Sequence, residues 1–245
     1  MSATRGIGPR SCSLVLVASM LIVGFAGCQP AARADQAKRF EMWEEPSHQL
    51  VFVDGPARVL DVRIVAGVTS EFHKHRFATT YVVIQDALVA NQFWGGEWST
   101  SGPRAYRKAG GTVDNSSYVE SPYYHRVRNE DQRTFHLVAV INERSATGAT
   151  TTADVAVSDG VIDNRWFREY RIQVSRGSNS DTQKFAGDLV LIQPVAGLSH
   201  IIEDGVAHSH KSTPAAFSWH KAGSEFQIAN RSEEDLEFIL IELKE

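Results

Sequence analysis

Short runs of β-branched and aromatic residues, separated by turn residues, recur along the chain from Gln49 onward. Before residue 145 these runs are QLVFV (49–53), ARVLDVRIV (57–65), TTYVVIQDALVANQFW (79–94), GGTVDNSSYV (110–119) and RTFHLVAVINE (133–143). Pairs such as Gly95-Gly96 and Gly110-Gly111 mark turns between them. No run has the 3.6-residue period of an amphipathic helix. Many short strands in one domain predict an all-β antiparallel sandwich or barrel.

The strand pattern is interrupted by the low-complexity stretch SATGATTT (145–152) and then resumes. The later runs are FREYRIQV (167–174), DLVLIQPV (188–195) and DLEFILIEL (235–243). Aligning Asn129 with Asn230 superimposes the last run on RTFHLVAVINE, which indicates a weak internal duplication. We therefore expect two similar halves, 47–145 and 159–245, joined by a linker at 146–158. A single barrel with a β-rich appendage is the alternative.

Composition and charge restrict the functional classes. Hydrophobic residues make up 42% of the 245 residues, charged residues 22%, and the formal net charge is −4. These values are ordinary for a globular protein, and the scattered lysines and arginines do not form a nucleic-acid surface. Both cysteines, Cys12 and Cys28, precede the strand pattern, so the folded part has no disulfide or thiolate chemistry.

The first 28 residues have the layout of a secretory signal peptide, with Arg5 and Arg10 before an apolar run at 14–25. Cys28 ends a stretch that resembles a bacterial lipobox and would be lipidated there. Cleavage after Ala34 is the alternative. We expect export, either to the cell envelope as a lipoprotein or to the periplasm, with membrane contact only through the lipid. Residues 29–46 then form a tether.

Two histidines stand two residues apart in the stretch GVTSEFHKHRFATTY (67–81). Side chains at i and i+2 of a strand project from one face, so His73 and His75 direct two imidazoles into the same space, and Glu71 shares that face. His125, in PYYHRVRN (122–129), offers a third imidazole. Three neutral imidazoles suit one divalent transition metal: Fe(II), Zn, Mn, Ni or Cu.

The two stretches together resemble the motifs of the cupin family. The first cupin motif has a glycine, five further residues and then HxH, as Gly67 is followed by VTSEF and then by His73 and His75. The second has P, H and N in the order and the H-to-N spacing of Pro122, His125 and Asn129, although Tyr124 replaces its glycine. The resemblance implies a double-stranded β-helix, that is a jelly-roll barrel, and a bicupin when both halves are counted.

One position departs from the family pattern. The cupin glutamate ligand falls at Thr79 or Thr80, so the implied ligand set is His73, His75 and His125 alone. Such three-histidine sites resemble those of non-haem iron dioxygenases, which favours Fe(II) and a small organic substrate. A non-catalytic, ligand-binding envelope protein is the alternative, and homodimers are common in the family. Glu71 either assists the site by a hydrogen bond or proton transfer, or is a solvated strand-end carboxylate.

The second half lacks a matching ligand set. Depending on the alignment, the positions of His73 and His75 become Asp181 and Gln183 or Gln183 and Phe185, and Phe226 stands for His125. We therefore expect one metal site in the chain. The remaining histidines are interpreted as follows: His208 and His210 lie in a loop, His136 is a hydrogen-bonded wall or surface residue, and His200 and His220 have no assigned role.

Overall fold

The computed structural model of the chain describes residues 38–99, 106–144, 162–210 and 212–244. They belong to one compact unit, Ala34–Glu245. Within the described residues there is no α-helix, and no helix with the length and apolarity to cross a membrane. The all-β prediction is confirmed for this part of the chain. The predicted signal peptide, both cysteines and the linker at 146–158 lie outside the described residues.

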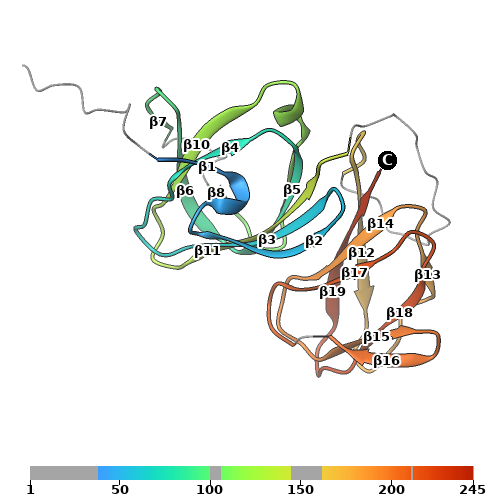
Figure 1. Cartoon of the computed structure of the whole chain (residues 1–245). Coiled ribbons are helices and arrows are strands. Elements are labelled where there is room, and N and C mark those ends of the chain that lie inside the picture. Colours follow the sequence, from blue (N-terminus) through green and yellow to red (C-terminus); the bar gives the residue numbers. More distant parts are fainter. Residues whose placement is uncertain (1–37, 100–105, 145–161, 211, 245) are drawn as a thin grey trace, which may run out of the picture. The chain divides into compact units, whose positions relative to one another are not determined.

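The first half consists of two sheets that enclose a barrel interior (Figure 1). One sheet has the order β2-β3-β11-β5-β9, with strands His48–Asp54, Ala57–Ile64, Phe135–Asn142, Ala78–Gln85 and Thr112–Asn115. The other has the order β1-β4-β10-β6-β7, with strands Arg39–Glu41, Phe72–His75, Tyr123–Asn129, Ala87–Phe93 and Trp98–Ser99. The short strand β8, Tyr106–Arg107, pairs with β6, and two 3-10 turns, η2 (Met42–Glu44) and η3 (Ser116–Val119), complete the barrel.

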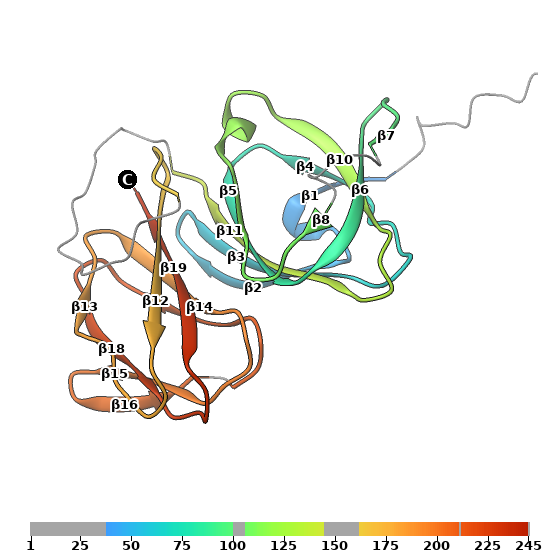
Figure 2. The same ribbon diagram turned by 180° about the vertical axis from the view of Figure 1, so that it is seen from behind.

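The second half repeats this plan with two smaller sheets (Figure 2). The sheet β12-β19-β14-β17 contains Phe167–Val174, Leu236–Leu243, Asp188–Gln193 and Ala216–His220. The sheet β13-β18-β15-β16 contains Gln183–Lys184, Glu225–Asn230, Ser199–Glu203 and Val206–Ser209.

Strand β11 shows why some runs in the sequence are almost continuously apolar. All eight of its residues are buried. Leu137 and Ile141 face the interior of the first barrel, whereas Val138 and Val140 join a cluster that also contains Val190 and Ile239 of the second half. A strand that is covered on both faces has no polar face, so it loses the alternation typical of half-exposed strands.

The expected duplication is confirmed by matching hydrogen bonds in the two halves. The amide of Asn129 donates to the carbonyl of Ile64, and the amide of Asn230 donates to that of Val174, both at 2.9 Å. Ser70 and Ser180 likewise each accept a backbone N–H bond at 2.9 Å from the strand that carries the asparagine. These equivalences support the bicupin interpretation over the appendage.

Two segments differ from the sequence-based picture. Residues from Arg39 onward, expected in the tether, belong to the fold: β1 pairs in parallel with β4, and Met42 is buried. His208, expected in a loop, lies on β16, which forms a hairpin with β15 around Asp204 and Gly205. Both turn residues have positive φ, at 50° and 76°. An Asp-Gly pair in this conformation is a strong hairpin turn, and it outweighs the polar composition.

Candidate metal centre

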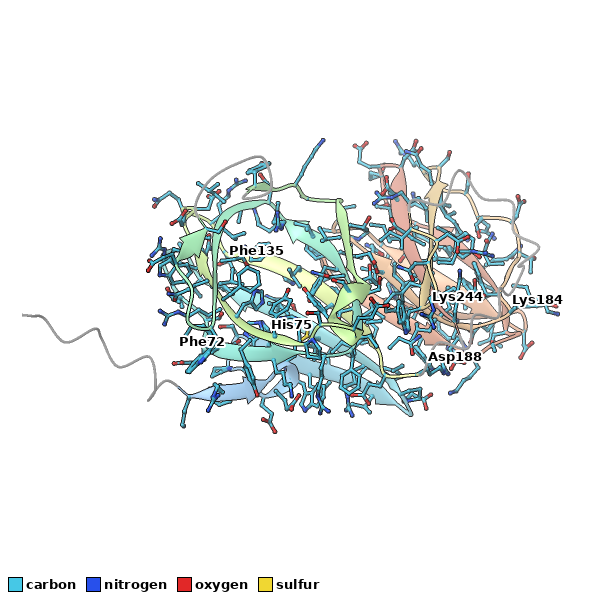
Figure 3. The ribbon with its side chains drawn as sticks, turned by 90° about the horizontal axis from the view of Figure 1, so that it is seen from above. Phe72, His75, Phe135, Lys184, Asp188 and Lys244 are labelled. Carbon is cyan, nitrogen blue, oxygen red and sulfur yellow. The ribbon has the colours of Figure 1, made fainter. Side chains whose placement is uncertain are left out.

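The register between β4 and β10 brings the three predicted histidines together. The two strands are antiparallel neighbours, with His125 opposite His73 and Tyr123 opposite His75. Because His73 and His75 are two residues apart on β4, both point to the barrel interior. Figure 3 shows His75 and Phe135 inside the first barrel. The strand period therefore supplies two imidazoles, and the sheet pairing supplies the third.

The three imidazoles form a compact buried cluster. Their candidate ligand atoms all lie within 4.8 Å of one another, and the three pairs of ring centroids are 4.6 to 4.9 Å apart. His73 and His75 are 1% and 3% exposed. No other group of three or more metal-ligating side chains is found among the described residues.

Hydrogen bonds orient two of these rings. Nδ1–H of His73 donates to the backbone carbonyl of Glu71 at 2.9 Å, which leaves Nε2 as the ligand atom. Nδ1 of His75 lies 3.2 Å from the hydroxyl of Tyr81, and that hydroxyl donates to Tyr118 at 3.3 Å. With Nδ1–H donating to Tyr81, Nε2 of His75 carries a lone pair, and this buried atom has no partner in the protein. An unsatisfied buried nitrogen between two other imidazoles fits a metal ligand.

The cluster is electrostatically prepared for a cation. Burial, followed by the charge of neighbouring histidines, holds the pKa of His73 and His75 well below 6.5. Burial also lowers the pKa of His125 to about 3. All three rings are therefore neutral at pH 7, which is the protonation state that binds a metal.

A fourth imidazole, His48, escaped the sequence analysis. Its Nδ1–H donates to the carbonyl of Met42 at 2.7 Å, and its ring meets that of His73 edge-on at 4.4 Å between centroids. Burial lowers its pKa to about 4. His48 begins β2 and has no neighbouring histidine in the sequence, so no spacing rule could have indicated it. It reaches the site only because the barrel closes.

Glu45, which the sequence analysis did not single out, fixes the segment before β4 by hydrogen bonds. Its carboxylate accepts hydrogen bonds from the backbone N–H groups of Glu71 at 2.9 Å and Ser47 at 2.7 Å. The side chain of Glu71 itself is exposed, so it contributes to the histidine cluster through its carbonyl oxygen. Of the two roles considered for its carboxylate, the exposed position is that of a solvated strand-end side chain, and the backbone carbonyl already satisfies Nδ1 of His73.

Neither threonine replaces the missing carboxylate. The hydroxyl of Thr79 donates to the carbonyl of Phe77 at 3.0 Å. Thr79 shares a strand face with Tyr81 and Val83, which line the barrel interior, whereas Thr80 lies on the opposite face. The described site thus has three imidazoles and no carboxylate ligand.

The depressed histidine pKa values predict that the metal-free protein loses stability in mild acid. Unfolding restores a pKa near 6.5, so between pH 6.5 and the folded values the unfolded chain binds more protons. The stabilisation is complete above pH 6.5 and declines as the pH falls. At pH 5, protonation of His48 and of His125 in the unfolded chain should each lower the free energy of unfolding by about 2 kcal/mol. Urea unfolding of the chelator-treated protein at pH 7, 6 and 5 measures this loss.

The variant His48→Gln provides the control, because it removes one of the four buried rings and should flatten the pH dependence of the unfolding free energy between pH 7 and 5. An equal slope in the variant and the original protein would contradict the assignment of this loss to the histidine cluster.

The histidines open onto a cavity of about 360 Å³ within the first barrel. This volume is near the lower end of the roughly 300–1,000 Å³ of small-molecule sites. Its walls are mostly apolar and aromatic, with a few polar groups. They include Val62, Ile64, Val83, Val89, Phe93, Val127, Phe135 and Leu137, together with Tyr81, Tyr118, Tyr123, Asn91, Asn115, Ser99 and Arg107.

The described part of the second half has no counterpart of this cluster. Strand β13 pairs with β18 so that Gln183 lies opposite Phe226, just as His73 lies opposite His125. The alignment on the glycines, which makes Phe185 the equivalent of His75, therefore agrees with the register. Both phenylalanines are buried in the core of the second half. Apolar packing occupies the space that the ligands occupy in the first half.

The remaining histidines lie outside this cluster, and two of them, His136 and His220, have side-chain hydrogen-bond partners. His136 contacts Asp61 at 2.7 Å, as expected for a hydrogen-bonded wall residue. Nδ1–H of His220 donates to Glu203 at 2.6 Å, and its Nε2 accepts from the hydroxyl of Ser218 at 2.8 Å. His208 is exposed on β16, and His200 lies opposite Ser209 in the same hairpin.

Comparisons with solved structures bring out the same architecture. AerE from Microcystis aeruginosa matches 82% of this chain and 99% of its own at 10% identity, with a TM-score of 0.59. A cupin 2 conserved barrel domain protein from Leptotrichia buccalis matches 80% and 88% at 10% identity, with a TM-score of 0.52. Salicylate 1,2-dioxygenase from Pseudoaminobacter salicylatoxidans matches 76% and 68% at 9% identity, with a TM-score of 0.53. No protein-family model and no curated protein sequence matches the chain. At these identities the likeness concerns the fold.

Proposed function

This chain has the cupin fold, and we propose that it is an exported protein whose first barrel binds one divalent transition metal, Fe(II) in the working form, through His73, His75 and His125. We further propose that it acts as a non-haem dioxygenase on a small organic substrate. The observation that carries the proposal is the buried cluster of three neutral imidazoles, with the unpartnered Nε2 of His75, at the wall of a ligand-sized cavity.

The donor set suits such chemistry. Three imidazoles leave positions on a bound metal for other ligands, and the metal supplies Lewis acidity and, as iron, redox reactivity towards dioxygen. The protein contributes a mostly apolar cavity beside the three imidazoles. His48, which packs against His73, keeps that ring in place.

The tyrosines that line the cavity provide protonated phenol groups. Burial raises the pKa of Tyr81, Tyr118 and Tyr123, so all three phenols stay protonated at neutral pH. Tyr81 joins the ring of His75 to the hydroxyl of Tyr118. The cavity can therefore donate a hydrogen bond from a phenol to a bound oxygen atom close to the histidines.

The proposal predicts one transition metal ion per chain and turnover that depends on it. Elemental analysis of the mature protein gives the metal content, and an oxygen electrode measures dioxygen uptake by the Fe(II)-loaded protein with diketones, flavonols, thiols and aromatic acids. We expect uptake with one of these classes, abolished by chelation and restored by Fe(II). Metal without uptake would favour the non-catalytic alternative, and absence of stoichiometric metal would refute the site.

A further inference from the structure

The strands that carry the three ligand histidines also present a surface on the other side of their sheet. Residues alternate between the two sides of β4 and β10, so the neighbours of His73, His75 and His125 point away from the cavity. Lys74 lies opposite Tyr124 on that outer side. Figure 1 shows the sheet β1-β4-β10-β6-β7 to which both strands belong. We refer to the cations and aromatic rings on this side as the outer face, which consists of Arg39, Phe72, Lys74, Trp94, Trp98, Tyr124, Arg126 and Arg128.

Cations lie over the aromatic rings of the outer face. The guanidinium of Arg39 is 4.9 Å from the ring centroid of Trp94. Those of Arg126 and Arg128 are 5.1 and 4.5 Å from the ring of Trp98. Both tryptophans are half-buried. Stacking on a ring orders a guanidinium and leaves the N–H groups on its rim able to bind a phosphate or carboxylate.

Within the part of the chain that the structure describes, three cations of the outer face have no acidic partner. Arg39, Lys74 and Arg126 form no ion pair with any described residue. Glu41 is the paired position of Lys74 on β1, but its carboxylate bonds to Arg76 at 3.1 Å. The outer face therefore carries positive charge that the described residues do not neutralise.

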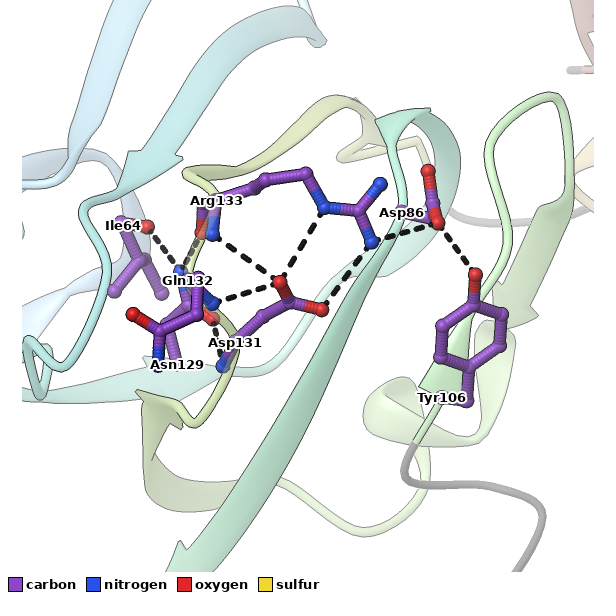
Figure 4. A network of polar contacts seen from close by, with 7 residues as sticks. All are labelled: Ile64, Asp86, Tyr106, Asn129, Asp131, Gln132 and Arg133. Atoms are coloured by element: carbon purple, nitrogen blue, oxygen red, sulfur yellow. Dashed lines mark hydrogen bonds and ion pairs between the residues drawn. The ribbon is translucent and has the colours of Figure 1, made fainter.

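Other arginines of the same barrel are neutralised within the protein. Arg128 donates to Glu130 at 2.6 Å. Arg133 donates to Asp86 at 2.9 Å and to Asp131 at 3.3 Å, so its guanidinium lies between two carboxylates (Figure 4). The lack of acidic partners is thus particular to Arg39, Lys74 and Arg126, and it favours an external anion as their partner.

We propose that the outer face binds the anionic headgroups of a phospholipid surface, with Arg39 and Arg126 on the phosphates and Trp94 and Trp98 at the boundary of the acyl chains. Tryptophan suits this boundary because most of its ring is apolar and its N–H can still bond to water or a headgroup. An anionic polysaccharide fits less well, since a sugar binds tryptophan by stacking on the ring face, where the cations already lie.

The attachment point of the N-terminal segment supports a membrane partner. β1 begins with Arg39, so the preceding segment joins the fold at the outer face. Cys28, the predicted site of lipidation, is eleven residues earlier, which is at most about 40 Å of extended chain. A lipid there would keep the outer face near the membrane, and a basic surface strengthens such an anchor. This support rests on the predicted lipidation, whereas the charges and rings of the outer face do not.

Vesicle sedimentation tests the inference. The protein from Asp35 onward, the predicted mature form without lipid, is mixed with vesicles of phosphatidylcholine alone or of phosphatidylcholine and phosphatidylglycerol. We expect binding to the anionic vesicles to be about 100-fold tighter at low ionic strength and to be lost at high salt, because each of three cations contributes about fivefold. Equal binding to the two vesicles, or no binding to either, would overturn the proposal. Binding to soluble heparin without binding to the anionic vesicles would also overturn it, in favour of a polysaccharide.

Variants locate the charges responsible. Arg39→Gln combined with Arg126→Gln should weaken binding to the anionic vesicles about 25-fold, and lysine at both positions should retain most of it. Lys108→Gln combined with Lys184→Gln is the matched control, because both lysines are exposed, lie outside the outer face and carry the same total charge. Thermal unfolding of each variant checks that it is folded. A folded double glutamine variant of the arginines with unchanged affinity would refute the inference.

Vesicles with brominated acyl chains test the role of the tryptophans. Bromine quenches the fluorescence of a tryptophan that reaches the acyl chains, so we expect vesicle binding to quench the protein. Trp98→Phe should reduce this quenching, whereas Trp219→Phe, on β17 of the second half, should leave it unchanged. Binding without any quenching would contradict the placement of the tryptophans at the acyl boundary.

This inference does not depend on the metal. The imidazoles lie on the opposite side of β4 and β10, so metal-free and Zn-loaded protein should bind the vesicles equally. Vesicle binding by a protein that takes up no metal would refute the proposed function alone. One metal per chain without vesicle binding would refute this inference alone.

Discussion

Replacing His73, His75 or His125 by alanine is expected to reduce the metal content of the purified protein from one ion per chain to a small fraction. Each substitution removes one of three nitrogens in a cluster that has no carboxylate to compensate for the loss. Losing a residue that merely orients a ligand already costs roughly 10–100-fold in affinity, so losing a ligand should cost more. Elemental analysis and competition with a chromogenic chelator measure the change.

The chain offers a matched control for this experiment. His208 and His210 form a second HxH pair, on strand β16 and directly after it, yet among the residues that the structure describes they belong to no metal-ligating cluster. His208→Ala should keep the full metal content. Because His73 and His75 are buried, alanine could also disturb the fold, so His75→Gln serves as a polar variant of closer size. Metal retained in all three alanine variants, or lost equally in His208→Ala, would contradict the site.

The sequence allowed the three histidines to be predicted for two different reasons. His73 and His75 follow from strand geometry, because a spacing of two places both on one face whatever the rest of the fold does. His125 lies 50 residues after His75, and only the resemblance of its surroundings to the second cupin motif indicated that its strand pairs with β4. The local strand pattern thus predicted His73 and His75, and the resemblance to the cupin motif predicted His125.

His48 and Arg107 could not be predicted, because nothing in their neighbourhood distinguishes them from surface residues. His48 begins a strand, and Arg107 lies on a strand of two residues that pairs with β6 over a long sequence separation. Both enter the cavity through closure of the barrel, which depends on contacts between distant segments. The hairpin at Asp204-Gly205 was predictable from its turn residues, and treating the polar composition as decisive caused the wrong loop assignment of His208.

Replacing Asn129 by alanine is expected to lower the free energy of unfolding by about 4 kcal/mol, given a cost of about 1–3 kcal/mol for each buried polar group left unpaired. The Asn129 amide donates to the carbonyls of Ile64 at 2.9 Å and Arg133 at 2.7 Å, and its oxygen accepts the N–H of Asp131 at 3.0 Å. The Asn129 side chain is fully buried, and its bond to Ile64 is out of reach of water, whereas the bonds to Arg133 and Asp131 are part-buried. Urea unfolding monitored by tryptophan fluorescence gives the value.

The second half contains an equivalent asparagine, Asn230, which allows the effect on stability to be separated from the effect on metal binding. Asn230 donates to Val174 at 2.9 Å and to Glu234 at 2.8 Å, so Asn230→Ala should destabilise the protein by a similar amount. Only Asn129 lies on the strand that carries His125. Asn129→Ala should therefore also weaken metal binding, whereas Asn230→Ala should leave it intact. The exposed Asn179, whose side chain accepts one bond from Arg231, serves as the control, and Asn179→Ala should cost less than about 1 kcal/mol. Equal metal affinity in the Asn129 and Asn230 variants would show that the hydrogen bonds of Asn129 stabilise the fold alone and do not fix the position of His125.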